Sequence, residues 1–210
     1  MKQSARFWDR VAERYAKMPV RDEAAYQKKL QLTREYFRPD MEVLEIGCGT
    51  GSTAIAHAPY VKHIHAIDIS SKMIDIAQGK AKAGNIGNVT FKHASIEELG
   101  APAQSLDAVL ALNLLHLLDD RDETIARIHT MLKPGGVFVS STVCLRDMAM
   151  LFRIVAPVAG FFGLLPLIKV LSARELEDSL TRAGFAIDRQ WRPGKNKAVF
   201  IVARKAGMRD

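Results

Sequence analysis

The sequence predicts an α/β protein built around a mostly parallel sheet, and three observations lead to this prediction. Short β-branched and aliphatic runs alternate with helical segments from residue 42 to residue 142. Strands connected in this way lie parallel, because each crossover helix returns the chain to the same edge of the sheet. The last two strands are separated only by a Pro-Gly turn region, which predicts an antiparallel hairpin at the sheet edge.

The helices follow from apolar spacing and from residues that start or stop a helix. The first two predicted helices carry apolar side chains at intervals of three and four residues, and Pro39 ends the second. The last helix begins with a capping box of Ser172 and Glu175 and stops before Gly184. The predicted helices span residues 4–17, 22–37, 51–58, 71–83, 121–132 and 172–183.

The strands are short and rich in Val, Ile and Leu, as buried strands are. No repeat, low-complexity tract or linker separates them, so we expect one domain over residues 1–210, with 1–40 as a helical cap at its N-terminus. The predicted strands span residues 42–46, 63–68, 89–92, 106–111, 136–142, 185–191 and 198–203.

Composition excludes several classes of protein. The chain has 210 residues, of which 48% are hydrophobic and 25% charged, so disorder and collagen-like repeats are excluded. Its net charge of +7 is interleaved with acidic residues, which favours a solvated surface over a nucleic-acid footprint. Cys48 and Cys144 lie far apart without metal-ligand spacing, and the chain begins without an apolar signal segment, so we expect reduced thiols, no metal site and a cytoplasmic location.

Glycines at alternate positions follow the first predicted strand. Gly47, Gly49 and Gly51 stand between that strand and a helix, where absent side chains allow a sharp turn and let a ligand lie on the backbone. The N–H groups at the start of the next helix suit a carboxylate or phosphate. A tight turn without a ligand is the alternative interpretation.

An acidic residue ends the second strand. Asp68 lies 21 residues beyond Gly47, near the spacing at which a carboxylate accepts the hydroxyl protons of a ribose. Such a carboxylate repels a 2′-phosphate. The order of strand, glycines, helix, strand and acid therefore predicts a nucleoside-type ligand that is not NADP-like.

Four motifs resemble the class I S-adenosylmethionine-dependent methyltransferases, and the resemblance covers essentially residues 7–204. It implies a Rossmann-like sheet of seven strands, one of them antiparallel, with helices on both faces, and S-adenosyl-L-methionine as cofactor. The motifs are LEIGCGTG (44–51), AIDIS (66–70), LDAVLALNLLHLLDD (106–120) and LKPGGVFVSSTV (132–143).

The resemblance also implies which residues contact the cofactor. Glu45 and the glycines would surround its methionine part, Asp68 would hold the ribose and Ile69 would face the adenine. The acid that meets the adenine amino group in many relatives is absent, and we interpret Glu97 and Glu98 as charges in the first turn of a helix. The complete expected set is Glu45, Gly47, Cys48, Gly49, Gly51, Asp68, Ile69, Met73, Ala94, Ser95, Leu112 and Asn113.

Two residues are candidates for catalysis. His116 follows the fourth predicted strand, where it would act as a general base for a protonated acceptor. The alternative interpretation is a histidine between leucines that only packs and hydrogen-bonds. Tyr15 lies in a segment similar to the N-terminal helix that covers the cofactor in many members of the family. Its alternative role is to anchor that helix as a partly buried side chain.

The acceptor is suggested by an uncharged segment. Residues 154–168 are too short and too interrupted by Pro and Gly to span a membrane, so we expect an apolar lid over the substrate within residues 145–172. Core filling, a dimer surface and shallow lipid docking remain open alternatives. The predicted function is methyl transfer to a small, partly apolar acceptor. The alternatives are a nucleic-acid methyltransferase and a non-catalytic cofactor-binding protein.

Overall fold

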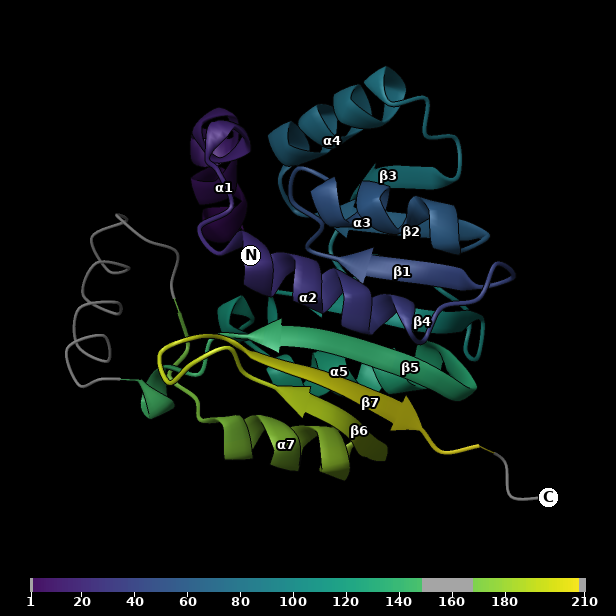
Figure 1. Ribbon diagram of the computed structural model, residues 1–210, viewed down its shortest axis with the longest axis vertical. Coiled ribbons are helices and arrows are strands. Elements are labelled where there is room, and N and C mark those ends of the chain that lie inside the picture. Colours follow the sequence, from purple (N-terminus) through teal and green to yellow (C-terminus); the bar gives the residue numbers. More distant parts are fainter. Residues whose placement is uncertain (1, 149–167, 208–210) are drawn as a thin grey trace. The chain divides into compact units, whose positions relative to one another are not determined.

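A computed structural model describes residues 2–148 and 168–207 and contains the seven predicted strands (Figure 1). The lid prediction for residues 145–172 falls largely outside the described residues. The strands are β1 (Glu42–Ile46), β2 (His63–Asp68), β3 (Val89–His93), β4 (Leu106–Leu112), β5 (Leu132–Thr142), β6 (Phe185–Trp191) and β7 (Val199–Lys205).

The strands form one seven-stranded sheet in the order β3-β2-β1-β4-β5-β7-β6. β1 pairs in parallel with β2 and with β4, and β2 pairs in parallel with β3. β7 runs antiparallel to both of its neighbours, β5 and β6, so the predicted hairpin at the sheet edge is confirmed. The mostly parallel α/β fold is therefore confirmed.

Helices and single 3-10 turns connect the strands. Ser172 and Glu175 form the predicted capping box, and Gly184 after the last helix has the positive φ of 94° that favours glycine there. The elements are α1 (Lys2–Lys17), α2 (Glu23–Arg34), α3 (Ser52–His57), α4 (Ser71–Ala83), α5 (Arg121–Met131) and α7 (Ala173–Arg182), with 3-10 turns η1 (Ala58–Tyr60), η2 (Leu115–Leu117) and η3 (Leu145–Asp147).

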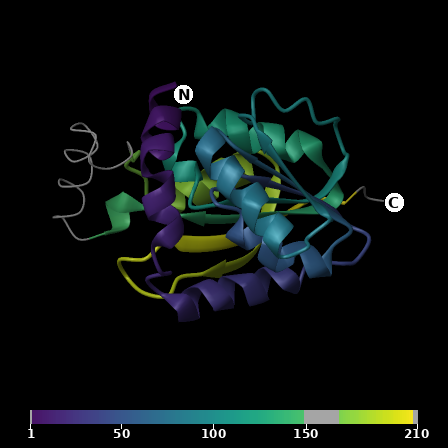
Figure 2. The same ribbon diagram turned by 90° about the horizontal axis from the view of Figure 1, so that it is seen from above.

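The fold divides into two compact units, Met1–Ala101 with Leu106–Leu110, and Pro102–Ser105 with Ala111–Asp210. In the first unit, α1 packs against α4, and Figures 1 and 2 show the two helices side by side. The core of this unit is aliphatic because β1 and β2 bury residues such as Val43 and Ile64 completely.

The second unit is centred on β5 and β7, which pair along six positions from Val137 to Thr142. Phe138 and Phe200 are fully buried in this unit, and Phe138 packs against the ring of Phe185 on β6. The prediction of a single domain over residues 1–210 stays a prediction.

Two boundaries and one helical turn predicted from the sequence are wrong. α2 ends at Arg34, before Pro39, because Tyr36 and Phe37 donate backbone hydrogen bonds three residues back and close a tight turn. β5 starts four residues early, at Leu132, since its backbone continues through the Pro-Gly pair with Gly135 at a φ of 75°. No helix follows β3, where residues 96–98 form a turn, so Glu97 and Glu98 are not first-turn helix charges.

Candidate functional site

The loop after β1 depends on glycine for two different reasons. Gly47, Gly49 and Gly51 all have positive φ angles, of 67°, 53° and 75°. A Cβ atom at Gly51 would lie 2.8 Å from the Cβ of Ala77 and from the ring of Phe91, so this glycine permits close packing. A Cβ atom at Gly49 would meet no atom within 4 Å. Gly49 therefore presents bare backbone to open space, as a residue beside a ligand does.

Asp68, the last residue of β2, ties this loop to the next one. Its Oδ2 atom accepts the Gly49 N–H at 2.8 Å, and its Oδ1 atom accepts the Ser70 N–H at 2.9 Å. Burial raises the pKa of Asp68 above its usual value, and the two N–H donors oppose that rise. A carboxylate has about four acceptor positions. Two of them are used by the backbone, so Asp68 can still accept hydroxyl donors.

Glu45, the penultimate residue of β1, is a buried carboxyl group without a complete set of partners. It is 3% exposed, and its Oε2 atom has no hydrogen-bond partner among the described residues. Burial, reinforced by the negative charge of Asp68, raises the pKa of Glu45 to about 8. The end of β1, just before the glycine loop, therefore contains a carboxyl group that is largely protonated at neutral pH and has no donor for Oε2 in the part of the chain that the structure describes. A cation placed beside it would supply one.

Other predicted residues of this unit line the same loops. The Cys48 N–H donates to the Ile67 carbonyl at 3.0 Å, and burial raises the pKa of the Cys48 thiol, which keeps it protonated and unreactive. Ile69 is partly exposed, whereas Met73, in the first turn of α4, is buried at 1% exposure. Burial therefore gives Met73 a packing role in the first unit, whereas Ile69 keeps an accessible side chain.

The end of β3 lies against the end of β2. The Ala94 N–H donates to the Asp68 carbonyl at 3.1 Å, and both Ala94 and Ser95 are buried. Ser95 and Glu98 are reciprocal partners: the Ser95 N–H donates to Glu98 Oε2 at 2.9 Å, and the Glu98 N–H donates to Ser95 Oγ at 3.4 Å. The hydroxyl of Ser95 is thus already used in a local turn.

α1 brings Tyr15 and an unpredicted residue, Asp9, to this site. The Tyr15 ring contacts Trp8 edge-on at 6.0 Å and is 48% exposed. Burial and, to a smaller extent, the charge of Asp68 raise the pKa of Tyr15 above its usual value. Asp9 accepts hydrogen bonds from Ser70 and Lys72 at the start of α4. The sequence offers no sign of this contact, since it joins residues 61 positions apart.

In the second unit, Leu112, Asn113 and His116 follow one another at the end of β4. Asn113 has a φ of 58°, which asparagine tolerates better than most residues, and its N–H donates to the Ser141 carbonyl at 2.7 Å. His116 is 5% exposed, and its Nδ1 atom accepts the Val143 N–H at 3.3 Å. These bonds join the ends of β4 and β5.

The hydrogen-bond pattern fixes the state of His116. Because Nδ1 accepts a hydrogen bond, the neutral ring is assigned its hydrogen on Nε2. Burial lowers the pKa of His116 to about 4, so the ring is neutral near pH 7. This geometry fits the packing alternative. General-base catalysis by His116 stays a prediction, and it requires the Val143 bond to break.

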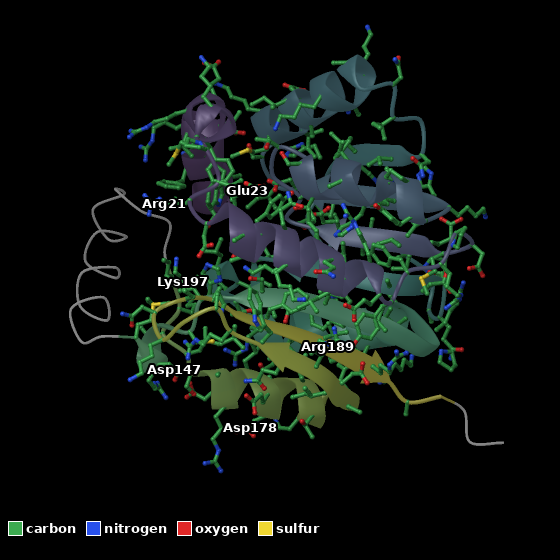
Figure 3. The ribbon with its side chains drawn as sticks, viewed as in Figure 1. Arg21, Glu23, Asp147, Asp178, Arg189 and Lys197 are labelled. Carbon is green, nitrogen blue, oxygen red and sulfur yellow. The ribbon has the colours of Figure 1, made fainter. Side chains whose placement is uncertain are left out.

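The second unit also contains a hollow of about 270 Å³ beside α5 and α7. None of the predicted site residues lines it. Charged side chains of both signs line it, including Asp178, which Figure 3 labels on α7. Its lining residues are Arg121, Val170, Leu171, Glu175, Asp178 and Arg182.

The described residues contain neither a metal-binding cluster nor a membrane-spanning helix. Within 2–148 and 168–207, His, Cys, Asp and Glu form no group of three or more that could hold a metal ion. In the same residues, no helix combines the length and apolar character needed to cross a membrane.

Comparison with known proteins identifies the family of the glycine-loop region. Residues 43–136 match the family model described as a methyltransferase domain. The chain is 30% identical over 153 residues to a malonyl-(acyl-carrier protein) O-methyltransferase of Paenibacillus sp., covering 69% of this chain and 55% of the relative. It is 32% identical over 124 residues to a ubiquinone biosynthesis O-methyltransferase of Coxiella burnetii, covering 59% of this chain and 52% of the relative.

Solved structures share the fold at low sequence identity. The crystal structure of the (4+2)-cyclase SpnF matches with a TM-score of 0.74 and 20% identity, covering 86% of this chain and 80% of SpnF. Likeness at this identity concerns the fold alone. The chain spans about half the length of the curated relatives that it matches.

Proposed function

We propose that this protein, whose residues 43–136 form a class I S-adenosylmethionine-dependent methyltransferase domain, transfers a methyl group from S-adenosylmethionine to a small-molecule acceptor. The observation that carries the proposal is the buried Glu45 carboxyl group, whose Oε2 atom has no donor within residues 2–148 and 168–207, together with the bare backbone of Gly49 and the Asp68 carboxylate. Glu45 offers a partner to an ammonium group, Gly49 leaves room for a ligand, and Asp68 offers acceptors for hydroxyl groups.

The residues of the first unit fit the chemistry of the cofactor. Glu45 would pair with the ammonium group of the methionine part. The positive charge of that group would compensate the buried negative charge of the Glu45 carboxylate. Asp68 would accept the ribose hydroxyls with the lone pairs that its two backbone bonds leave over. Ile69 would contact the adenine, with Ala94 and Ser95 beside it. Met73 is proposed as support behind these residues because it is buried.

Placement is the main catalytic contribution expected from the chain. S-adenosylmethionine supplies a methyl group on a positively charged sulfonium, which a nucleophile attacks directly. Holding two reactants in line contributes roughly 7–11 kcal/mol to lowering a barrier. Tyr15 would exclude water by covering the cofactor, and Leu112 and Asn113 would border the transferable methyl group. General-base catalysis by His116 applies only to acceptors that arrive protonated.

The acceptor is proposed to be partly apolar. Residues 154–168 are uncharged, as a lid over an apolar substrate would be, and they lie outside the described residues. The similarity to a malonyl-(acyl-carrier protein) O-methyltransferase and to a ubiquinone biosynthesis O-methyltransferase supports an acceptor with an acyl or quinone-like part. A cytoplasmic location and peripheral contact with membranes belong to the same proposal.

Two measurements on the full chain test the proposal. Calorimetric titration with S-adenosylhomocysteine should give saturable binding, and Asp68→Asn should weaken it at least tenfold, because charge-assisted hydrogen bonds contribute about 1.5–3 kcal/mol each. Asp107→Asn is the matched control, since Asp107 binds the Glu42 N–H at the start of β1. Unchanged binding by Asp68→Asn would contradict the ribose assignment.

Methyl-labelled cofactor then identifies the acceptor class. Incubation with metabolite, protein and RNA fractions should transfer label to small molecules that partition into organic solvent. Label confined to RNA would instead indicate a nucleic-acid methyltransferase. Binding without transfer to any fraction would indicate a non-catalytic protein or a different reaction on the same fold, as the name of the cyclase neighbour illustrates.

A further inference from the structure

The Asp9 carboxylate on α1 lies at the start of α4, where it contacts Ser70. Ser70 is two residues beyond Asp68, the residue proposed to bind the ribose. The Asp9 Oδ1 atom accepts the hydroxyl of Ser70 at 2.7 Å and the N–H of Lys72 at 3.3 Å. Both partners belong to the first unit, where α1 packs along α4 (Figure 2). Asp9 therefore connects α1 to the loop that follows β2.

Ser70 is the link between Asp9 and Asp68. Its side chain caps α4 by accepting the Met73 N–H at 3.2 Å, and its own N–H donates to Asp68 Oδ1 at 2.9 Å. Ser70 is fully buried, so its hydroxyl needs both partners inside the protein. A shift of Ser70 would move the donor that fixes one oxygen of Asp68.

We infer that Asp9 is a positioning residue for the cofactor: it holds Ser70, and through Ser70 it orients Asp68 and docks α1 over the ribose. This inference rests on the proposed cofactor site. Among the described residues, Asp9 forms no hydrogen bond with the glycine loop or with Asp68. The inference therefore adds a residue that the proposed site does not include.

The role requires an acceptor atom at this position. Asn retains a carbonyl oxygen that can accept both the Ser70 hydroxyl and the Lys72 N–H, whereas Ala retains none. Asp9→Asn should therefore behave much more like the unmodified protein than Asp9→Ala does. If only the negative charge mattered, the two variants would lose affinity equally.

The test measures binding, independently of activity. We expect Asp9→Ala to raise the Kd for S-adenosylhomocysteine about tenfold by calorimetry, the order of one charge-assisted hydrogen bond, and Asp9→Asn to raise it less than threefold. In the ligand-free protein, Asp9→Ala should also speed amide hydrogen exchange in α1, with circular dichroism showing that the fold persists. Glu13→Ala is the control, because Glu13 is exposed on the same helix and its side chain forms no hydrogen bond or ion pair with the described residues.

A double variant tests whether Asp9 acts through Ser70. Asp9→Ala combined with Ser70→Ala should bind no more weakly than the weaker single variant, because both changes interrupt one connection. Additive losses, an unchanged Kd for Asp9→Ala or an equal loss for Glu13→Ala would overturn the inference. Failure of the unmodified protein to bind S-adenosylhomocysteine would instead overturn the proposed function, so the two failures are distinguishable.

Discussion

Two glycines of the loop after β1 should respond differently to the same substitution. Both have positive φ, so an alanine at either position is strained by about 1–2 kcal/mol. At Gly51 the added Cβ would also lie 2.8 Å from Ala77 and Phe91, and overpacking of this kind costs about 1–3 kcal/mol more. Gly51→Ala is therefore expected to lose about 2–5 kcal/mol of unfolding free energy, and Gly49→Ala about 1–2 kcal/mol.

Cofactor affinity should follow the opposite order. Gly49→Ala is expected to be the more stable of the two variants and the weaker binder. The Cβ of Gly49→Ala would occupy the open space assigned to the ligand, so its affinity for S-adenosylhomocysteine should fall by more than about tenfold despite the smaller loss of stability. Urea unfolding and calorimetric titration measure the two quantities. Gly79→Ala, on the exposed face of α4 with no close contact, should be stabilising by up to about 1 kcal/mol. Normal affinity of Gly49→Ala, or equal stability of the two loop variants, would refute this reasoning.

Three further predictions follow from buried ionisable groups. Glu45 has a pKa of about 8 in the folded protein, above its ordinary 4.5. Its stabilising contribution is therefore present below pH 4.5 and lost as the pH rises through 8. Glu45→Gln should match the unmodified protein in unfolding free energy at pH 5 and exceed it by a few kcal/mol at pH 8.5. His57 is completely buried with a pKa of about 3, so stability should fall as the pH drops from 6.5 toward 3, and His57→Leu should flatten that decline in acid unfolding curves. His116→Asn should leave kcat within about tenfold, because in the unmodified protein the Val143 N–H occupies Nδ1 of His116 and keeps the ring from acting as a base. A loss of about 10²–10⁴-fold at unchanged cofactor affinity would instead identify a general base.

The predicted fold agrees closely with the structure because, over residues 42–142, each strand and helix of the fold is also favoured by its own local sequence. Strands such as His63–Asp68 and helices such as Ser71–Ala83 are bounded by residues that act locally, including the Ser70 cap. Boundaries failed where the local backbone decides the outcome, as in the tight turn at Phe37 and in the extended backbone at the start of β5. β5 begins at Leu132, before its pairing with β7 begins at Val137.

The candidate site was predictable to the extent that it lies at strand ends. Glu45, Gly49 and Asp68 are all found from their positions relative to strands, because parallel strands bring their carboxyl ends to one edge. The Asp9 contact and the Val143 partner of His116 were not predictable, since they connect residues 61 and 27 positions apart through tertiary packing. The missing partner of Glu45 is likewise a property of the folded core alone.

The unpaired carboxyl group of Glu45 makes ligand binding and proton release one event. At pH 7, a group with a pKa of about 8 is roughly nine-tenths protonated, and pairing with an ammonium ion favours its ionised form. Binding of S-adenosylhomocysteine at pH 7 should therefore release up to about one proton, and this number should fall toward zero at pH 9. Calorimetry in buffers of different ionisation enthalpy measures the released protons directly. Glu45→Gln, which has no proton to lose at this position, should abolish the release while binding more weakly. Equal proton release from Glu45→Gln would show that another group provides the proton and that the ammonium partner has been assigned to the wrong residue.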